Sequence, residues 1–594
     1  MLTPSALRFL AFLPDHAGNP LHFGSDVAKA VTDLTKSITR HDPDLGPLRN
    51  VAGCLLWTAV RPVDVPILVS ADGRSCSVGW SFDDTRRASS VGRWGGFVTI
   101  ARDPQGRWSV YRSADGVMTA CAIRIRGGLI VASQMPAWLL KAVGIVPDID
   151  WNVIAAVLGD PTITGHQSAL RGVVMIPPGC RMDGDVSGGD VVGAHAARHL
   201  RIKTIWDPCA IARKARAMPV AVAEKTLRGA VDEAVGAWGS VADHMLLELS
   251  GGLDSSILAG TLGTLLPDRR ITLVNASTIQ AGGDERRYAR DVAKLCKRQL
   301  VEIDADRRVL DVAELRDLAH PSEPILYGLD AGHDMQMTAH AHAVGADAIF
   351  TGQGGDAIFY QMPDLTIAVD AFRLWGWRAV FSTRTRDITR RAQRSIWSAW
   401  ASMLADQFGR SSSSERFPSP MATPAAAEQA GTYIHPWLTG LKDLPPAKAR
   451  QVEAVAHSQI FYGPTLRAQS TLFVHPLLSQ PVVEACLSIP IPILTGGRGD
   501  RQRARAAFAD RLPTSVAQRH SKGEAASHYS LAVMNAVTDL RSLLLDGRLV
   551  SQGLLDRAAL DAALNAETLL WKDVARPLML YASIEAWIRY WERA

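Results

Sequence analysis

The sequence predicts an α/β protein in two parts: a β-rich N-terminal domain over residues 1–205 and a parallel-sheet α/β domain over residues 206–594. Three observations predict this organisation. Short β-like runs alternate with glycine turns in the first part, strands alternate with helices from Met245 onward, and a glycine-rich loop follows the first of those strands. A chain of 594 residues is also too long for a single core.

The N-terminal domain is indicated by β-forming residues bounded by glycines. Residues 95–100, 108–111 and 128–133 are the clearest runs of this kind. Between His199 and Pro219 the pattern becomes basic and helical. This change places the domain boundary near Trp206.

The second domain alternates predicted strands with predicted helices. Strands are expected at residues 245–249, 271–278, 300–304 and 348–351, with helices at 284–297 and within 309–345. This alternation is typical of a parallel sheet covered on both faces, whose ligands bind at the carboxyl ends of the strands. Residues 357–450 are helical and irregular, and a serine run with three prolines predicts an exposed loop within them.

The loop after the first strand has the composition of a pyrophosphate cradle. It precedes a predicted amphipathic helix that has Ile257, Leu258, Leu262 and Leu265 on one face. Its residues are Ser250, Gly251, Gly252, Leu253, Asp254, Ser255 and Ser256. The glycines let the backbone approach an anion, while loop amides, the helix N-terminus and the serine hydroxyls supply donors.

This loop differs from the Walker loop because no lysine follows its glycines, and Asp254 lies where Mg²⁺ would bridge phosphates. The chemistry that it implies is cleavage of ATP between the α and β phosphates. The alternative is a Ser/Gly turn that caps a helix, with Asp254 complementing the helix dipole.

A second glycine-rich segment, residues 351–357, also follows a strand. We expect Gly354 to contact ATP and Asp356 to be a second carboxylate on the magnesium held by Asp254. The segment formally satisfies a relaxed dinucleotide fingerprint, with Asp370 after a strand-like run at 365–369. That interpretation is rejected, because Pro363 leaves too little room for a crossover helix.

Composition excludes several classes of protein. No apolar stretch is long enough to span a bilayer, the N-terminus does not resemble a signal peptide, and the seven cysteines are scattered singly. We therefore expect a cytoplasmic protein with reduced, buried thiols and no nucleic-acid partner. His333, His340 and His342 are predicted to be surface or core histidines, since positions two apart on a helix point away from each other.

Two stretches are locally basic. Residues 373–394 carry seven arginines against one aspartate, and residues 498–522 are also basic. Either stretch could attract an acidic peptide or the phosphates of ATP. For the first stretch, a solvated helix face is the favoured alternative.

Taken in order, these motifs resemble the asparagine synthetase superfamily over nearly the whole chain. Residues 472–478 and 482–490 resemble that family's "PFLD…VEFALSLP" segment, and residues 505–508, 512–513 and 519–523 resemble its closing stretch with the catalytic lysine. The resemblance implies an N-terminal glutaminase-like domain of the Ntn type. It also implies a PP-loop synthetase domain that adenylates a carboxylate with ATP, with Lys522 as the catalytic lysine beside Asp254 and Asp356.

Two departures from the family pattern narrow the expected activity. The family's glutaminase nucleophile is a cysteine at the mature N-terminus, whereas the second residue here is Leu2, so no glutaminase activity is expected. Gln353 stands where asparagine synthetases carry glutamate and β-lactam synthetases carry tyrosine. A neutral amide cannot act as a general base, so a residue other than Gln353 must have that role.

Among members without glutaminase activity, the chain looks most like the lasso peptide cyclases. Residues 351–356 and 496–501 carry this narrower resemblance. It implies a macrolactam synthetase that joins a peptide's N-terminal amine to an Asp or Glu side chain, with ATP and Mg²⁺. Expected partners are the leader-cleaved precursor peptide and, in the same pathway, a leader peptidase and a precursor-recognition protein. The alternatives are a small-molecule amide or β-lactam synthetase, an asparagine synthetase that uses free ammonia, and a silent ATP-binding scaffold.

Overall fold

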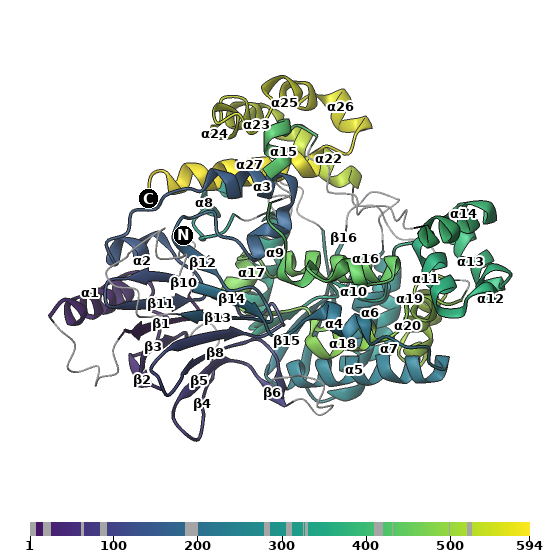
Figure 1. The fold of residues 1–594 in the computed structure, drawn as a ribbon, viewed down its shortest axis with the longest axis horizontal. Coiled ribbons are helices and arrows are strands. Elements are labelled where there is room, and N and C mark those ends of the chain that lie inside the picture. Colours follow the sequence, from purple (N-terminus) through teal and green to yellow (C-terminus); the bar gives the residue numbers. More distant parts are fainter. Residues whose placement is uncertain are drawn as a thin grey trace.

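The computed structural model combines antiparallel sheets in its N-terminal part with a parallel sheet and many helices in its C-terminal part (Figure 1). The described residues are 7–15, 25–60, 64–83, 92–184, 200–277, 285–304, 312–324, 326, 331–408, 420–429, 432–497, 499–519 and 526–594. None of the described helices is both long and apolar enough to cross a lipid bilayer. All seven cysteines are free thiols, and six of them are buried.

Two six-stranded antiparallel sheets form the N-terminal part. The first has the order β12 (Val173–Met175), β10 (Cys121–Ile125), β11 (Gly128–Ala132), β1 (Phe9–Pro14), β3 (Cys54–Thr58), β2 (Arg49–Val51). The second has the order β14 (Leu200–Thr204), β13 (Cys180–Gly184), β9 (Trp108–Arg112), β8 (Phe97–Arg102), β5 (Ser75–Gly79), β4 (Ile67–Val69). The indole N–H of Trp108 in β9 donates to the carbonyl of Pro14 in β1 at 2.9 Å, so the two sheets lie against each other. The three β-runs predicted in this region are confirmed.

The prediction of a helical pattern from His199 onward was wrong for its first residues. Residues 200–204 form strand β14, in which Leu200 and Ile202 pack against the core while Arg201 and Lys203 are exposed. This alternation has the period of a strand. Helix α4 (Pro208–Arg213) begins only after Asp207, whose carboxylate accepts two helix N–H groups.

A five-stranded parallel sheet is the framework of the C-terminal part. Its order is β17 (Leu300–Asp304), β16 (Arg270–Ser277), β15 (His244–Glu248), β18 (Ala348–Phe350), β19 (Leu472–Val474). Alternate side chains of β15 enter different clusters: Leu247 joins the main core, whereas Leu246 packs with Met337 of helix α9 (Ala331–Val344). The sheet is therefore buried on both faces, as its alternating sequence predicts.

Two predictions about helices in this part need correction. Helix α6 (Leu253–Leu265) follows the phosphate loop as predicted, but it is buried nearly all round rather than on one face. The run at 365–369 belongs to helix α11 (Thr366–Trp375), not to a strand, and Asp370 within it accepts the backbone N–H groups of Ala447 and Lys448. An apolar run of five residues fits a buried helix turn as well as a strand, so its period alone could not separate the two.

Helices between β18 and β19 form an arm at the right of Figure 1, and helices after β19 form most of a cap at its top. The arm consists of α11, α12 (Trp377–Val380), α13 (Thr383–Arg391) and α14 (Ile396–Gln407). The cap includes α22 (Ala526–Asn535), α23 (Val537–Leu544), α25 (Arg557–Ala563), α26 (Ala566–Trp571) and α27 (Ala575–Trp591). In α27, the indoles of Trp587 and Trp591 both donate to the carbonyl of Pro321, which joins the cap to the rest of the molecule.

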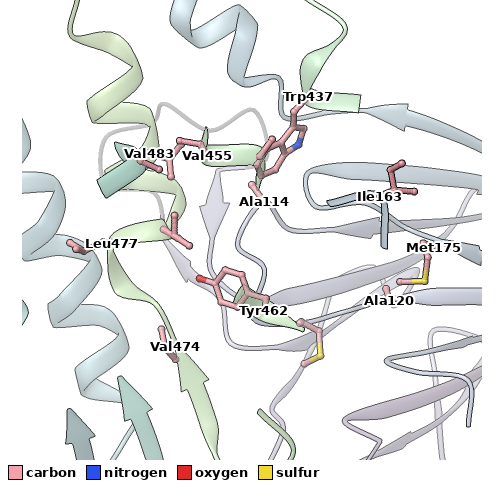
Figure 2. Packing of buried hydrophobic residues seen from close by; sticks show 14 of the residues in the cluster. Ala114, Ala120, Ile163, Met175, Trp437, Val455, Tyr462, Val474, Leu477 and Val483 are labelled. Atoms are coloured by element: carbon pink, nitrogen blue, oxygen red, sulfur yellow. The ribbon is translucent and has the colours of Figure 1, made fainter. Parts of the chain in front are cut away.

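The N-terminal and C-terminal parts share one buried core. Figure 2 shows Ala114 from the first part beside Trp437 from the second, and both belong to the main core. The Trp437 indole donates to the carbonyl of Pro178 at 2.8 Å. Such contacts bury large aromatic area, and the Trp437 indole N–H keeps a hydrogen-bond partner.

Two histidines are buried at this junction. His166 and His435 meet edge to face with their ring centroids 4.8 Å apart. Burial lowers the pKa of His166 to about 4 and the pKa of His435 well below its usual value. Both rings are therefore neutral in the folded protein at pH values where they are protonated in the unfolded chain.

We expect the junction to be acid-sensitive. A lowered histidine pKa in the folded state means that the unfolded chain binds more protons between pH 6.5 and 4, so the free energy of unfolding falls as the pH decreases through this window. For His166 alone, the loss at pH 5 is about 2 kcal/mol. Urea titrations measure the free energy of unfolding at pH 7.5 and at pH 5.0. Between these two pH values, wild type should lose about 2 kcal/mol more of it than His166→Gln does. The exposed His342 provides the control, because His342→Gln should lose stability as wild type does. Equal losses in wild type and His166→Gln would contradict the prediction.

Candidate active site

A cavity of about 320 Å³ opens at the carboxyl ends of β15, β16 and β18. The phosphate loop forms one wall: Gly251 has a φ of 81°, and α6 begins immediately afterwards at Leu253. The remaining lining comes from segments distant in the chain. It includes Glu248, Val274, His333, Met337, Thr351, Gln353, Gly354, Asp356, Asp500, Arg501, Arg505 and Arg519. This volume lies at the small end of the range typical of ligand pockets.

The two glycine-rich segments are pressed directly against each other. A Cβ placed on Gly352 would lie 2.6 Å from the backbone nitrogen of Ser255, and one on Gly355 would lie 2.3 Å from Cγ of Asp254. Neither position can hold a larger side chain without moving its neighbour. The glycines after β18 thus bring Asp356 next to the phosphate loop.

Gly355→Ala should therefore separate the two loops. A displacement of about 1 Å in a reacting group costs on the order of a hundredfold in rate, so we expect pyrophosphate release to fall by about that factor. The matched control is Gly229→Ala in α5 (Val220–Ser240), where a Cβ meets nothing within 4 Å. A Gly355→Ala enzyme within threefold of wild type would contradict the proposed close packing.

Arg501 joins the two aspartates that the sequence singled out. Its Nη1 donates to Oδ2 of Asp254 at 2.7 Å and to Oδ1 of Asp356 at 2.5 Å. Its Nε donates to Asp500 at 2.8 Å, and only 5% of the side chain is exposed. Arg501 also has a φ of 48°, in the left-handed region, at the start of helix α20 (Gln502–Ala507). This backbone conformation is costly for a non-glycine residue and is retained where surrounding contacts impose it.

Charges of both signs surround Arg501. Its guanidinium faces the carboxylates of Asp254, Asp356 and Asp500. The Arg505 guanidinium also lies near Asp254 and Asp500. Although burial disfavours the charged form, these carboxylates raise the pKa of Arg501 above its usual value. The group is therefore a fixed cation held between these acids.

The same pair of carboxylates fits a magnesium ion. Because oxygens of Asp254 and Asp356 both contact one nitrogen, a single cation can reach both once the Arg501 side chain moves. Carboxylate oxygens are ligands that Mg²⁺ prefers, usually one or two together with substrate phosphates. Among the described residues, no group of three or more His, Cys, Asp or Glu side chains is arranged to hold a metal ion.

Two further arginines line the cavity. Arg505 donates to the carbonyls of Asp500 and Val516, and Arg519 contacts Glu285 and lies 4.1 Å from the centre of the Tyr288 ring. Burial, together with the neighbouring Arg501, lowers the pKa of Arg505. These cations lie beside the phosphate loop, where they can attract an anionic ligand.

Another part of the cavity lining contains a buried ion network and several apolar residues. Arg467 bridges Glu248 and Asp334 at 2.5 Å each, and His333 lies 3.2 Å from Glu248. Although burial opposes ionisation, Arg467 and His333 lower the pKa of Glu248 to about 2. The apolar residues are Leu249, Val274, Ala276 and Met337. The cavity thus has both charged and apolar lining, which suits a ligand with both properties.

The structure brings most of the predicted residues together. Ser250, Gly252, Asp254, Ser255, Gly354 and Asp356 all line the cavity. Ser256 does not, because it is fully buried and its hydroxyl donates to the carbonyl of Gly252 at 2.6 Å. Its hydroxyl is therefore occupied by a bond to the first turn of α6 and is not placed to bind phosphate. Leu2 and Lys522 lie outside the described residues.

Sequence reasoning missed Arg501 and the Glu248–His333–Arg467 contacts. The basic stretch at 498–522 was a partial signal, since three of its arginines line the cavity. His333, expected to be a surface or core histidine, faces Glu248 at the cavity edge instead. No local pattern indicates that pair, because the two residues are 85 positions apart.

Comparison with known proteins agrees with this arrangement. A family model described as asparagine synthase matches residues 226–589, which is more than half of the chain. The matched region contains the parallel sheet, both glycine-rich loops and Arg501. A search of curated proteins finds no match.

Proposed function

The chain belongs to the asparagine synthase family, a family of ATP-dependent ligases that form amide bonds, and we propose that it is a peptide macrolactam synthetase. In this proposal it adenylates an Asp or Glu side chain of a peptide, and the peptide's N-terminal amine then displaces AMP. The observation that carries the proposal is the pair Asp254 and Asp356, held on one cation beside a phosphate loop.

The two halves of the reaction balance. A peptide carboxylate oxygen attacks the α-phosphorus of ATP, the bond to the bridging oxygen of the β-phosphate breaks, and pyrophosphate leaves. The amine then attacks the acyl carbon, loses a proton, and AMP leaves with the acyl C–O electrons. The net products are one amide, AMP and pyrophosphate.

The residues that line the cavity would fix the orientation of ATP, with its phosphates at the phosphate loop and its adenine against apolar side chains. The amides of the Ser250–Ser255 loop and the N-terminus of α6 would hold the departing pyrophosphate, with Arg505 and Arg519 adding positive charge. Val274 and Met337 would contact the adenine. Asp254 and Asp356 would hold magnesium, which when bound neutralises charge on the phosphates.

Lys522 completes the proposal by resemblance to the family's catalytic lysine. An ammonium on a long side chain can neutralise charge that develops on the α-phosphate and later on the acyl oxygen. Gln353 lines the cavity and is exposed, but its amide cannot take the amine's proton. The loss of the acidic or phenolic group at this position supports a substrate other than those of asparagine and β-lactam synthetases.

Two measurements test the proposal. Carboxylate-dependent exchange of pyrophosphate into ATP should require a peptide with an Asp or Glu side chain, and mass spectrometry should show that the peptide product has lost one water. Free aspartate and small β-amino acids are tested as alternative carboxylate substrates for adenylation. Exchange with these small molecules and not with peptides would contradict the peptide assignment, whereas no exchange with any carboxylate would contradict adenylation itself.

A further inference from the structure

The arm formed by α11–α14 carries most of the exposed aromatic surface of the described chain. Five Phe or Trp side chains are recorded as highly exposed, and four of them lie on this arm: Trp377, Phe381, Trp397 and Phe408, at 67–79% exposure. The fifth, Trp571, lies on α26. Contiguous exposed apolar surface of this kind marks interaction sites, whereas single exposed residues do not.

Ring contacts and helical spacing relate these side chains to one another. Trp377 and Phe381 are four positions apart, Phe381 meets Trp400 edge to face at 6.0 Å, and Trp400 meets Trp397 at 5.0 Å. Leu404 and Phe408 follow Trp400 along α14 at four-residue spacing. We call the six residues Trp377, Phe381, Trp397, Trp400, Leu404 and Phe408 the aromatic strip. Trp400 is fixed by its indole, which donates to the carbonyl of Val380 at 3.1 Å.

Positive charge accompanies the aromatic strip. Arg378, Arg386, Arg390 and Arg394 are exposed, and no salt bridge is recorded for them within the described part of the chain. Of the two acids between 373 and 408, Asp406 is already paired with Arg373 at 2.6 Å. The surface therefore complements a ligand that carries both apolar and acidic side chains.

The arm also contacts the loop that carries Arg501. Arg391 of α13 donates to the carbonyl of Thr495 at 2.9 Å, six residues before Arg501. The strip lies on α12 and α14, and both of these helices contact α13, so a chain bound along the strip would lie next to the helix that touches the loop of the catalytic cavity. That proximity favours the substrate itself as the occupant.

We propose that the aromatic strip and its arginines bind an acidic, leucine-rich or aromatic segment of the peptide substrate, outside the residues that react. This inference rests on the proposed peptide ligase function. Rigid tryptophans and arginines are the residues that dominate binding energy at protein interfaces, and exposed arginines steer an acidic chain toward them. The segment supplies affinity, while the chemistry stays in the cavity.

The direct test is a binding assay without ATP. The probe is a fluorescein-labelled peptide of 16 residues, with leucines at three- and four-residue spacing between glutamates, and its counterpart with lysine at every glutamate. Fluorescence anisotropy should show binding of the glutamate peptide that weakens with salt, and at least tenfold weaker binding of the lysine peptide. Equal binding of the two peptides, or binding of neither, would overturn the proposal.

Variants locate the binding surface. We expect two double variants to bind the glutamate peptide at least tenfold more weakly than wild type does. The first is Phe381→Ser with Trp397→Ser, and the second is Arg386→Glu with Arg390→Glu. Circular dichroism and thermal midpoints verify that both variants are folded. Trp571→Ala and the exposed pair Arg74→Glu with Arg201→Glu are matched controls that should bind as wild type does. Wild-type binding by both strip variants would place the peptide elsewhere and overturn the proposal.

Two competing occupants have their own outcomes. Sedimentation with vesicles of phosphatidylserine and phosphatidylcholine that depends on the strip, without peptide binding, would assign the surface to a membrane. A dimer in light scattering that the Trp397→Ser variant dissociates would assign it to a second copy of the chain. Because the anisotropy assay needs no turnover, its failure is separate from a failure of pyrophosphate exchange, which would contradict the ligase function instead.

Discussion

Asp356→Asn is expected to reduce pyrophosphate release at least a thousandfold, and Asp254→Asn to do the same. Both carboxylates contact the same nitrogen of Arg501, so they lie close enough to hold one magnesium ion, and removing either would leave phosphate charge uncompensated as it develops. A thousandfold loss corresponds to about 4 kcal/mol of transition-state stabilisation. The rate of release of radiolabelled pyrophosphate, in the presence of a substrate peptide, measures this loss.

The matched control for both variants is Asp243→Asn, at an aspartate that is 95% exposed and paired with Arg269 on the surface. Its rate should equal that of wild type. If either Asp254→Asn or Asp356→Asn retained a near wild-type rate with unchanged magnesium dependence, the paired-carboxylate site would be wrong. Thermal unfolding of each variant separates loss of chemistry from loss of fold.

Arg501→Gln is expected to tighten divalent-cation binding by the ATP-free enzyme at least tenfold. In the structure, the Arg501 guanidinium lies between Asp254 and Asp356, so a metal ion must displace it before both carboxylates are available. Glutamine removes the competing charge and leaves the carboxylates in place. Electron paramagnetic resonance of free Mn²⁺ during a titration measures the affinity directly, without turnover.

Arg503→Gln is the control for this experiment, because Arg503 also belongs to α20 but pairs with Glu224, away from the two aspartates. It should bind Mn²⁺ as wild type does. The same affinity in Arg501→Gln and wild type would show that Arg501 does not compete with the metal. Weaker binding in Arg501→Gln would show that the arginine positions the carboxylates for the ion.

Features with a local cause could be predicted from the sequence. The phosphate loop, the strands around it and Asp356 after β18 follow from apolar runs that end in glycine, since this pattern reports backbone geometry within a few residues. Strand β17 was predicted at its observed bounds, Leu300–Asp304. Predictions failed where one short pattern fits two structures, as in the helical residues 365–369 and in β14.

The sequence alone determined the family, the parallel sheet, the two glycine-rich loops and the pair Asp254 and Asp356 as neighbours. Only the tertiary structure showed which cation lies between them, because Arg501 is 247 and 145 residues away from the two aspartates. The same holds for Glu248 with Arg467, and for the aromatic strip, whose exposure depends on what the arm packs against. Residue spacing fixes local backbone geometry, whereas charge pairing and exposure depend on which distant segments folding brings together.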